Sequence, residues 1–440
     1  MAATTGSSAK SETLEEALVG AYAGNPTLLA ERAALRATDE EVPQALSGWR
    51  PTVTVNADAG RSRVNTQTSF FTSAQNRKPI TSSLDLTQPL FRGLRTVSSV
   101  ARAENLVLSD RARLAETEQQ VLLDTVTAYM DVHRDGAVLD LATNNEQRLR
   151  RQLEAARDRF EVGEVTRTDV AQAEARLSNA VADRVRAEGD LIASRAAYLN
   201  AVGTLPGKLT RPEPAGGLPA SEDEARAAAV KANPAILRAQ YAERAAIYDV
   251  RIATGELLPE VNLVGQLGYS EDGGSRNSRT KQASIAARLT VPLYQSGAEY
   301  AAVRAARQVA AQRRIEVDEN RRTVIEDVTR AWQDLQTARA RITSFEDSVR
   351  ANEIALEGVE QEAAVGSRTT LDVLDAEQEL FTSKVDLVRA QRDEVVASFA
   401  LRAAIGALTA ASIGLDVEVY NPRAHYDAVR DKLWGFHGGG

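Results

Sequence analysis

The sequence predicts a mainly α-helical fold with a smaller β-strand portion, built twice within one chain. The composition is the first observation: aromatic residues are only 5% of the 440, and Ala, Arg, Glu, Leu and Val dominate, which is typical of long helices. The second is a stretch of 42 residues that occurs twice. The third is a seven-residue apolar period before each copy of that stretch.

The repeated stretch covers 162–203 and 365–406, and a constant shift of 203 aligns the two copies without a gap. Sixteen of the 42 positions are identical. Matching Asn-Pro pairs and strand motifs extend the duplication upstream in both halves. We therefore predict a first structural repeat over 1–210, a second over 211–415 and a C-terminal tail over 416–440.

Each half is expected to open with a helix that has an acidic first turn and is interrupted by proline. The apolar period then changes to two, which predicts four strands, at about 52–61, 81–91, 259–270 and 282–294. Long polar connections over 62–79 and 270–281 link the strands of each pair. Each of the four strand–helix junctions carries a proline: Pro51, Pro89, Pro259 and Pro292.

The seven-residue period then predicts long helices at about 96–161 and 298–364, followed by return helices over 168–203 and 371–406. The first long helix would measure roughly 100 Å at 1.5 Å per residue. A compact domain could not contain such a helix, so we expect helices packed side by side along their length.

The two copies of the repeated stretch predict a helix reversal. A glycine with positive φ ends the long helix, a threonine caps the return helix, and an aspartate follows in its first turn. The pattern occurs in both copies: Gly163, Thr166 and Asp169 in the first, and Gly366, Thr369 and Asp372 in the second.

Several function classes are excluded by composition and motifs. The net charge of −8 comes from interspersed signs without a basic aromatic stripe, so nucleic-acid binding is not expected. The absence of cysteine excludes disulfides, thiolate metal sites and a lipid anchor on an N-terminal Cys. His133, His425 and His437 lack metal-ligand spacing, so no metal or cofactor is expected. No nucleotide, serine-hydrolase or zinc-protease motif predicts an enzyme.

The sequence contains evidence both for and against a location in a membrane. The first residues lack the apolar region of a secretory signal, so either the protein is cytosolic or a signal has been removed. The nearest approach to a transmembrane helix, 395–415, is interrupted by Arg402 and broken by Gly406. The four strands, however, have about the 9 to 11 residues that cross an outer membrane at a tilt, with the alternation of barrel walls.

Two architectures fit these strands. Open sheet edges cannot lie in hydrocarbon, and bacterial barrels have at least about eight strands, so a membrane protein would need two chains for eight or three for twelve. The other architecture is a small sheet packed on a helical bundle in a soluble protein. The pattern alone does not choose between them.

The combined motifs resemble the TolC-type outer-membrane efflux proteins. They comprise two copies of VGxxTxxDVxxAxxxL, the segments LTQPLF and LTVPLY, and the paired Asn-Pro motifs, and the resemblance covers nearly the whole chain. The tail NPRAHYDAVRDKLWG resembles type I secretion members of that family. The resemblance implies a homotrimer with a twelve-stranded β-barrel in the bacterial outer membrane, continued by a twelve-helix α-barrel tunnel through the periplasm. It also implies a signal peptide that once preceded Met1.

The resemblance further implies the function and the partners. The chain would be the exit duct of a tripartite efflux pump or type I secretion system, working with an inner-membrane transporter and a periplasmic adaptor to pass drugs or polypeptides. It would contact outer-membrane lipid, perform no chemistry and need no cofactor. The alternative from another class is a soluble coiled-coil scaffold or adaptor.

By position in the family motif, the gate can be assigned. Arg368 corresponds to an arginine that tethers the inner coil to its neighbour, with Thr168 and Asp169 as its partners. Asp372 and Asp375 correspond to aspartates whose threefold copies ring the constriction. The family's tyrosine is missing at Ala363. Three copies of one Asp near an axis repel, raise one another's pKa and attract cations, so we expect a cation-selective gate there.

Overall fold

The computed structural model describes residues 12–436, which form two compact units. The helical unit comprises residues 12–33, 112–237 and 319–420, and the sheet unit comprises residues 34–111, 238–318 and 421–436. Each unit takes segments from both predicted repeats. The position of Met1, where a removed signal was predicted to have preceded the chain, and His437 lie outside the described residues.

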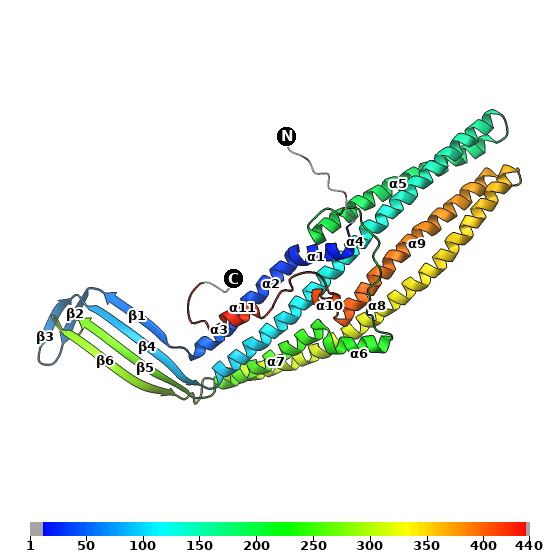
Figure 1. The fold of residues 1–440 in the computed structure, drawn as a ribbon. Coiled ribbons are helices and arrows are strands. Elements are labelled where there is room, and N and C mark those ends of the chain that lie inside the picture. The colour runs from blue at the N-terminus through cyan, green and yellow to red at the C-terminus, as the bar shows by residue number, and fades with distance from the viewer. Residues whose placement is uncertain (1–11, 437–440) are drawn as a thin grey trace, which may run out of the picture. The chain divides into compact units, whose positions relative to one another are not determined.

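The sheet unit contains four long strands: β1 (Thr52–Ala59), β4 (Ile80–Arg92), β5 (Glu260–Glu271) and β6 (Arg279–Thr290). They form one antiparallel sheet in the order β1-β4-β5-β6 (Figure 1). The central β4–β5 pair joins the two halves of the sequence, with Ile80 opposite Glu271 and Arg92 opposite Glu260. Strands β1 and β6 are edges of this sheet within the described chain.

The two faces of this sheet differ in polarity. A cross-strand row on one face joins Val55, Leu84 and Leu267, and Val55 is 74% exposed. On the other face, Asn56 Nδ2 donates to Asp85 Oδ2 across β1 and β4 at 2.9 Å. Among the described residues nothing covers the apolar face, because its side chains on the edge strands are largely exposed.

The long polar connection predicted over 62–79 does link β1 to β4, but it contains regular structure that the sequence did not predict. It forms a second hairpin, β2 (Ser62–Gln67) and β3 (Thr72–Arg77), closed by the Thr68 N–H, which donates to the Phe71 carbonyl at 2.9 Å. The hairpin has almost no apolar residues, so its strand periodicity cannot be read from hydrophobicity. The hairpin forms through backbone hydrogen bonds between β2 and β3, which polar residues also permit.

Three of the four junction prolines flank strands as expected, but Pro89 does not. Pro51 and Pro259 directly precede β1 and β5, and Pro292 follows β6 after Val291. Pro89 lies inside β4, where the register with β5 shifts between Pro89 and Phe91. Because β1 pairs with β4 only up to Thr87, this end of β4 tolerates a bulge and a residue without N–H.

Strand β6 begins and ends earlier than the predicted strand over 282–294. Its pairing with β5 starts at Arg279 opposite Glu271 and stops at Thr290 opposite Glu260. Pairing stops there because Glu260 is the first residue of β5, so the segment after Thr290 has no neighbouring strand in the sheet. The apolar alternation of Val291 and Leu293 therefore continues beyond the strand and was misleading.

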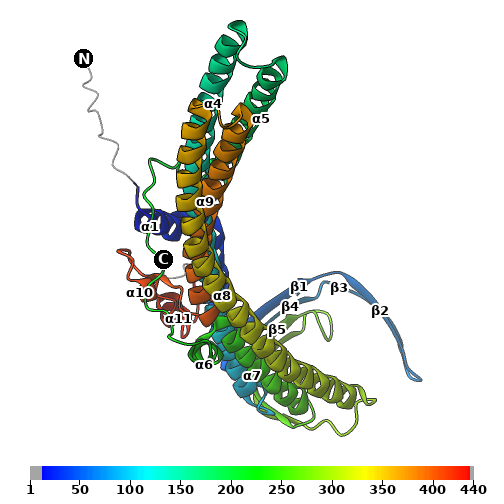
Figure 2. The same ribbon diagram turned by 90° about the vertical axis from the view of Figure 1, so that its right-hand side faces the viewer.

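The helices repeat their lengths between the halves. The long helices α4 (Arg95–Glu161) and α8 (Ala298–Ala364) have 67 residues each, and the return helices α5 (Arg167–Val202) and α9 (Thr370–Ile405) have 36 each. In the helical unit, the α4–α5 and α8–α9 hairpins run alongside each other (Figure 2). Fully buried Val328, Leu335 and Leu401 form part of the core between α8 and α9.

Shorter helices complete both units. They are α1 (Leu14–Gly24), α2 (Pro26–Asp39), α3 (Glu41–Leu46), the 3-10 turn η1 (Ser47–Trp49), α6 (Glu222–Ala232), α7 (Pro234–Gly255), α10 (Ala410–Ile413) and α11 (Ala424–Val429). The Asn-Pro pairs break the opening helix of each half. Asn25 Nδ2 donates to the Ala201 carbonyl at 3.0 Å, and Asn233 Nδ2 donates to the Ala404 carbonyl at 2.8 Å. Each asparagine thus ties an opening helix to its return helix.

Candidate functional site

The helix reversals predicted from the repeated stretch occur at the ends of α4 and α8. Gly163 and Gly366 adopt φ values of 81° and 79°, which a side chain would strain. In each turn a threonine and an aspartate cap each other: the Thr369 N–H donates to Asp372 Oδ2 at 2.9 Å, and the Asp372 N–H donates to Thr369 Oγ1 at 3.3 Å. Thr166 and Asp169 form the same reciprocal cap.

The cap of the second turn also sets the charge of Asp372. Hydrogen bonds from the Thr369 backbone and hydroxyl lower the pKa of Asp372, and the nearby Arg368 guanidinium lowers it further. Both groups stabilise the carboxylate form. Asp372 therefore presents a negative charge at the helix turn at neutral pH.

Arg368 pairs within its own hairpin. Its Nε donates to Glu362 Oε2 at 2.8 Å, which raises the pKa of Arg368. Within the described chain it makes no hydrogen bond or ion pair with Thr168 or Asp169. The predicted tether from Arg368 to those residues is therefore not an interaction inside one chain.

A different ion pair joins the two hairpins. Asp375 on α9 forms a salt bridge with Arg176 on α5. Next to it, Leu374 is only 1% exposed and packs into a cluster of α4 and α5 side chains that includes Leu149, Leu153 and Ala173. Sequence reasoning did not identify Arg176, because it lies 199 positions from Asp375 and so distant a pair leaves no local pattern.

Glu377, one turn along α9, is a second residue that sequence reasoning missed. It is only 2% exposed and its Oε2 has no hydrogen-bond partner within the described chain. Burial raises the pKa of Glu377, while Arg148 opposes the shift. The repeat counterpart Glu174 is about half exposed and pairs with Arg157 at 2.6 Å. The same residue type at matching positions of the two copies is therefore buried in one copy and exposed in the other.

Ala363 occupies the position where the resemblance predicts a tyrosine. Its methyl group packs against the α8–α9 cluster of Leu356, Val373 and Leu380. Its side chain offers no hydroxyl and contributes only packing, while its backbone carbonyl accepts a hydrogen bond from the Gly366 N–H at 3.1 Å.

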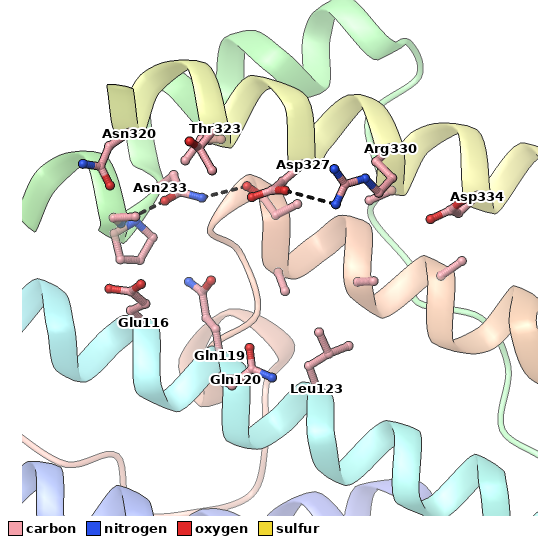
Figure 3. Close-up of a pocket in the computed structure, with 18 residues that line it drawn as sticks. Glu116, Gln119, Gln120, Leu123, Asn233, Asn320, Thr323, Asp327, Arg330 and Asp334 are labelled. Atoms are coloured by element: carbon pink, nitrogen blue, oxygen red, sulfur yellow. Dashed lines mark hydrogen bonds and ion pairs between the residues drawn. The ribbon is translucent and has the colours of Figure 1, made fainter. Parts of the chain in front are cut away.

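A groove of about 470 Å³ lies elsewhere in the helical unit, lined by α4, α8, α9 and the start of α7. Glu116 and Gln119 on α4 face Asp327 and Arg330 on α8 across it (Figure 3). The α9 wall is formed by alanines. Asp327 Oδ1 and Arg330 Nη1 are 3.8 Å apart, so the groove carries both signs of charge.

The histidines are separate from these features. His133 is half-buried, and burial lowers its pKa. His425 Nδ1 lies 3.3 Å from Asp39 Oδ2, and this contact fastens α11 within the sheet unit. Over residues 12–436, no three His, Cys, Asp or Glu side chains are grouped so that they could hold a metal ion. Over the same residues, no helix is long and apolar enough to cross a bilayer.

A sheet with one exposed apolar face and one polar face has the two faces that the wall of a membrane-spanning barrel requires, and it is combined here with paired long helices. Comparison with protein families agrees. The chain belongs to the outer membrane efflux protein family, which it matches over residues 17–204 and 226–407, one segment in each half.

Relatives and solved structures support this assignment. The outer membrane efflux protein BepC of Brucella suis is 40% identical over 432 residues, covering 98% of this chain and 93% of that protein. The outer membrane protein TolC of Vibrio cholerae is 28% identical over 426 residues, covering 92% and 93%. The outer-membrane channel CmeC of Campylobacter jejuni shares the fold with a TM-score of 0.80 at 15% identity, covering 89% and 85%.

These findings choose between the two classes of protein that the sequence left open. The chain is an outer-membrane efflux channel protein and not a soluble scaffold. Its family is one of transport channels.

Proposed function

We propose that three copies of this chain form a passive exit duct that carries drugs or polypeptides from the periplasmic side to the cell exterior. The observation that carries this proposal is the four-stranded sheet with an uncovered apolar face and two open edges. The likeness to BepC, whose name describes it as an efflux protein, favours efflux over secretion.

The strand count supports an oligomer. In a bilayer the unpaired N–H and C=O groups of β1 and β6 would cost several kcal/mol each, so the edges must pair with neighbouring copies. One chain supplies four strands, fewer than the roughly eight of the smallest barrels. Three copies supply twelve strands and, with α4, α5, α8 and α9 from each, a tunnel of twelve helices.

The polar face of the sheet suits the inside of such a barrel. Asn56, Ser83 and Asp85 bind one another there, so their polar groups face water rather than lipid. The apolar face carries Val53, Val55, Ile285 and Leu289, which are 61% to 74% exposed and would contact outer-membrane lipid.

The gate is proposed at the α8–α9 turn. Copies of Asp372 and Asp375 around the threefold axis would repel one another and attract cations, which makes the closed pore cation-selective. Within each chain, the Arg176–Asp375 salt bridge and the buried Leu374 hold α9 against α5 and α4. Opening would separate α9 from these helices, and Arg368 would contact Thr168 and Asp169 of an adjacent copy in the closed state.

Partners follow from the same proposal. A duct without a motor needs an inner-membrane transporter as the energy source and a periplasmic adaptor to join the two. We place no cofactor, no metal, no nucleic acid and no catalytic step in this function. The duct provides a path, and its selectivity lies in the charges that line the constriction.

Planar-bilayer recording tests the function directly. Purified protein should insert as discrete, long-lived conductance steps that prefer cations and that divalent cations block. A protein that stays monodisperse without detergent and never produces conductance steps would overturn the proposal.

A further inference from the structure

The segment that follows α11 presents large apolar side chains to solvent. Leu433 is 72% exposed, Trp434 is 87% exposed and Phe436 is fully exposed. Soluble surfaces seldom leave a tryptophan and a phenylalanine uncovered within three residues. We call residues 433–436 the aromatic tail.

The aromatic tail is attached to a well-fixed helix. Val429 of α11 is fully buried, and the Arg111 guanidinium lies 5.2 Å from the centre of the Tyr426 ring. Arg430 pairs with Glu104 at 3.3 Å. These contacts hold α11 against α4 within the sheet unit, so the tail leaves from a defined point.

A second attachment sets where the tail lies. Arg50 Nη1 donates to the Lys432 carbonyl at 2.8 Å, directly before the exposed residues. Arg50 is two residues from the start of β1. The neighbouring Trp49 is partly exposed, and its carbonyl accepts a hydrogen bond from Gln88 of β4. The aromatic tail therefore lies at the end of the sheet where the strands meet the helices (Figure 1).

We propose that the aromatic tail is a membrane anchor that inserts Trp434 and its apolar neighbours into the headgroup region of the periplasmic leaflet. The inference rests on the proposed barrel, because only a membrane-spanning sheet places its helix-side end at that leaflet. Tryptophan concentrates at the membrane–water interface because its ring is apolar and its N–H is polar.

Charge favours a lipid occupant over a second copy of the chain. Arg50 and Lys432 flank the aromatic tail, and basic residues beside an interfacial anchor attract anionic headgroups. The carboxylates close to this segment, Glu104 and Asp431, already pair with Arg430. The probe should therefore be a bilayer that contains phosphatidylglycerol.

The tryptophan content allows a direct test. The chain has three tryptophans, Trp49, Trp332 and Trp434. The double variant Trp49→Phe, Trp332→Tyr leaves Trp434 as the only indole. It is reconstituted in phosphatidylcholine–phosphatidylglycerol vesicles whose acyl chains carry bromine at shallow or deep positions. We expect the Trp434 emission to be blue-shifted and to be quenched more strongly by the shallow label than by the deep one. Iodide in solution should no longer quench it.

The matched control is Trp49→Phe, Trp434→Phe, which leaves only Trp332 in the helical unit and should show no quenching by brominated lipid.

Flotation with vesicles and single-channel conductance report separately on the barrel. If both variants float and conduct but Trp434 is as insensitive to brominated lipid as Trp332, the anchor is refuted and the barrel stands. Shielding from iodide in detergent without lipid quenching would also refute it, since a second copy would then cover the tail. Failure to float or conduct would refute the barrel and the anchor together.

Discussion

Asp372 and Asp375 lie one helical turn apart on α9, yet their partners differ. Asp372 is held by its own cap with Thr369, and Asp375 by Arg176 from the other hairpin. The first interaction fixes a charge at the turn, and the second fixes the position of α9. The proposed selectivity and the proposed closure thus depend on neighbouring residues with separate contacts.

The charge at the turn predicts selectivity. The double variant Asp372→Ala, Asp375→Ala should lose its preference for cations and its block by divalent ions, because the ring of carboxylates is gone. Reversal potentials in a salt gradient measure this. Thr166→Ala is the matched control, since it removes the same kind of cap, worth about 1 kcal/mol, from the first turn and leaves Asp169 in place. Unchanged selectivity in the double variant would remove both aspartates from the constriction.

The inter-hairpin salt bridge predicts leakage when it is removed. Arg176→Ser should raise the conductance of the closed channel by less than about fivefold per chain, because an exposed ion pair contributes only about 0.2 to 1 kcal/mol. Arg368→Ser should act in the same direction if the tether crosses between copies. Arg186→Ser, which removes only a surface pair with Asp183 on the same helix, is the control. Equal conductance in all three would assign no gating role to either arginine.

At the scale of elements, the sequence predicted the helices better than the strands. Gly163 and Gly366 identify the reversals because glycine adopts their positive φ without strain, and the bounds of α8 match the prediction. The β2–β3 hairpin was not predicted because its polar residues leave no period-two signal. Burial of Glu377 could not be inferred either, since it depends on how α9 packs against α4 and α8.

The buried carboxyl of Glu377 predicts a pH dependence. Because burial raises its pKa in the folded state, the folded protein binds this proton more tightly than the unfolded chain does. Its contribution to stability is full below the ordinary pKa of 4.5 and is lost as pH rises through the raised value. Glu377→Gln should therefore gain stability relative to wild type as pH rises above 4.5. Melting temperatures from pH 4 to 7 measure the difference between the two proteins, and a difference that stays constant with pH would contradict the raised pKa of Glu377.

The faces of the sheet predict opposite tolerance to charge. Ile285→Arg should impair insertion by about 2 to 4 kcal/mol near the middle of the bilayer, because it places a charge on the apolar face. Ser284→Arg, one residue earlier on the polar face, should insert normally. The partition of each variant between vesicles and denaturant solution measures its free energy of insertion. Equal insertion of the two variants would contradict the assignment of the faces.

At the scale of the whole molecule, the number of chains is the step that neither the strand pattern nor one chain decides. Four strands fit two copies or three. We propose three copies, as the resemblance to the TolC-type proteins implies, and the open edges of β1 and β6 explain why a single chain is not enough. The absence of cysteine from the chain makes the edges convenient to label.

The central claim is a trimeric barrel, and its most direct test measures the mass of the oligomer together with the pairing of β1 and β6 between neighbouring copies. Cysteines replace Ser284 on β6 and, in separate variants, Thr54, Asn56 or Asp58 on β1, so that the three β1 positions sample the register between copies. Native mass spectrometry in detergent should give three chains of 47.5 kDa each, and oxidation of one variant should join all three chains covalently. A mass of one or two chains, or no cross-link at any of the three positions, would contradict a trimeric barrel closed between β1 and β6.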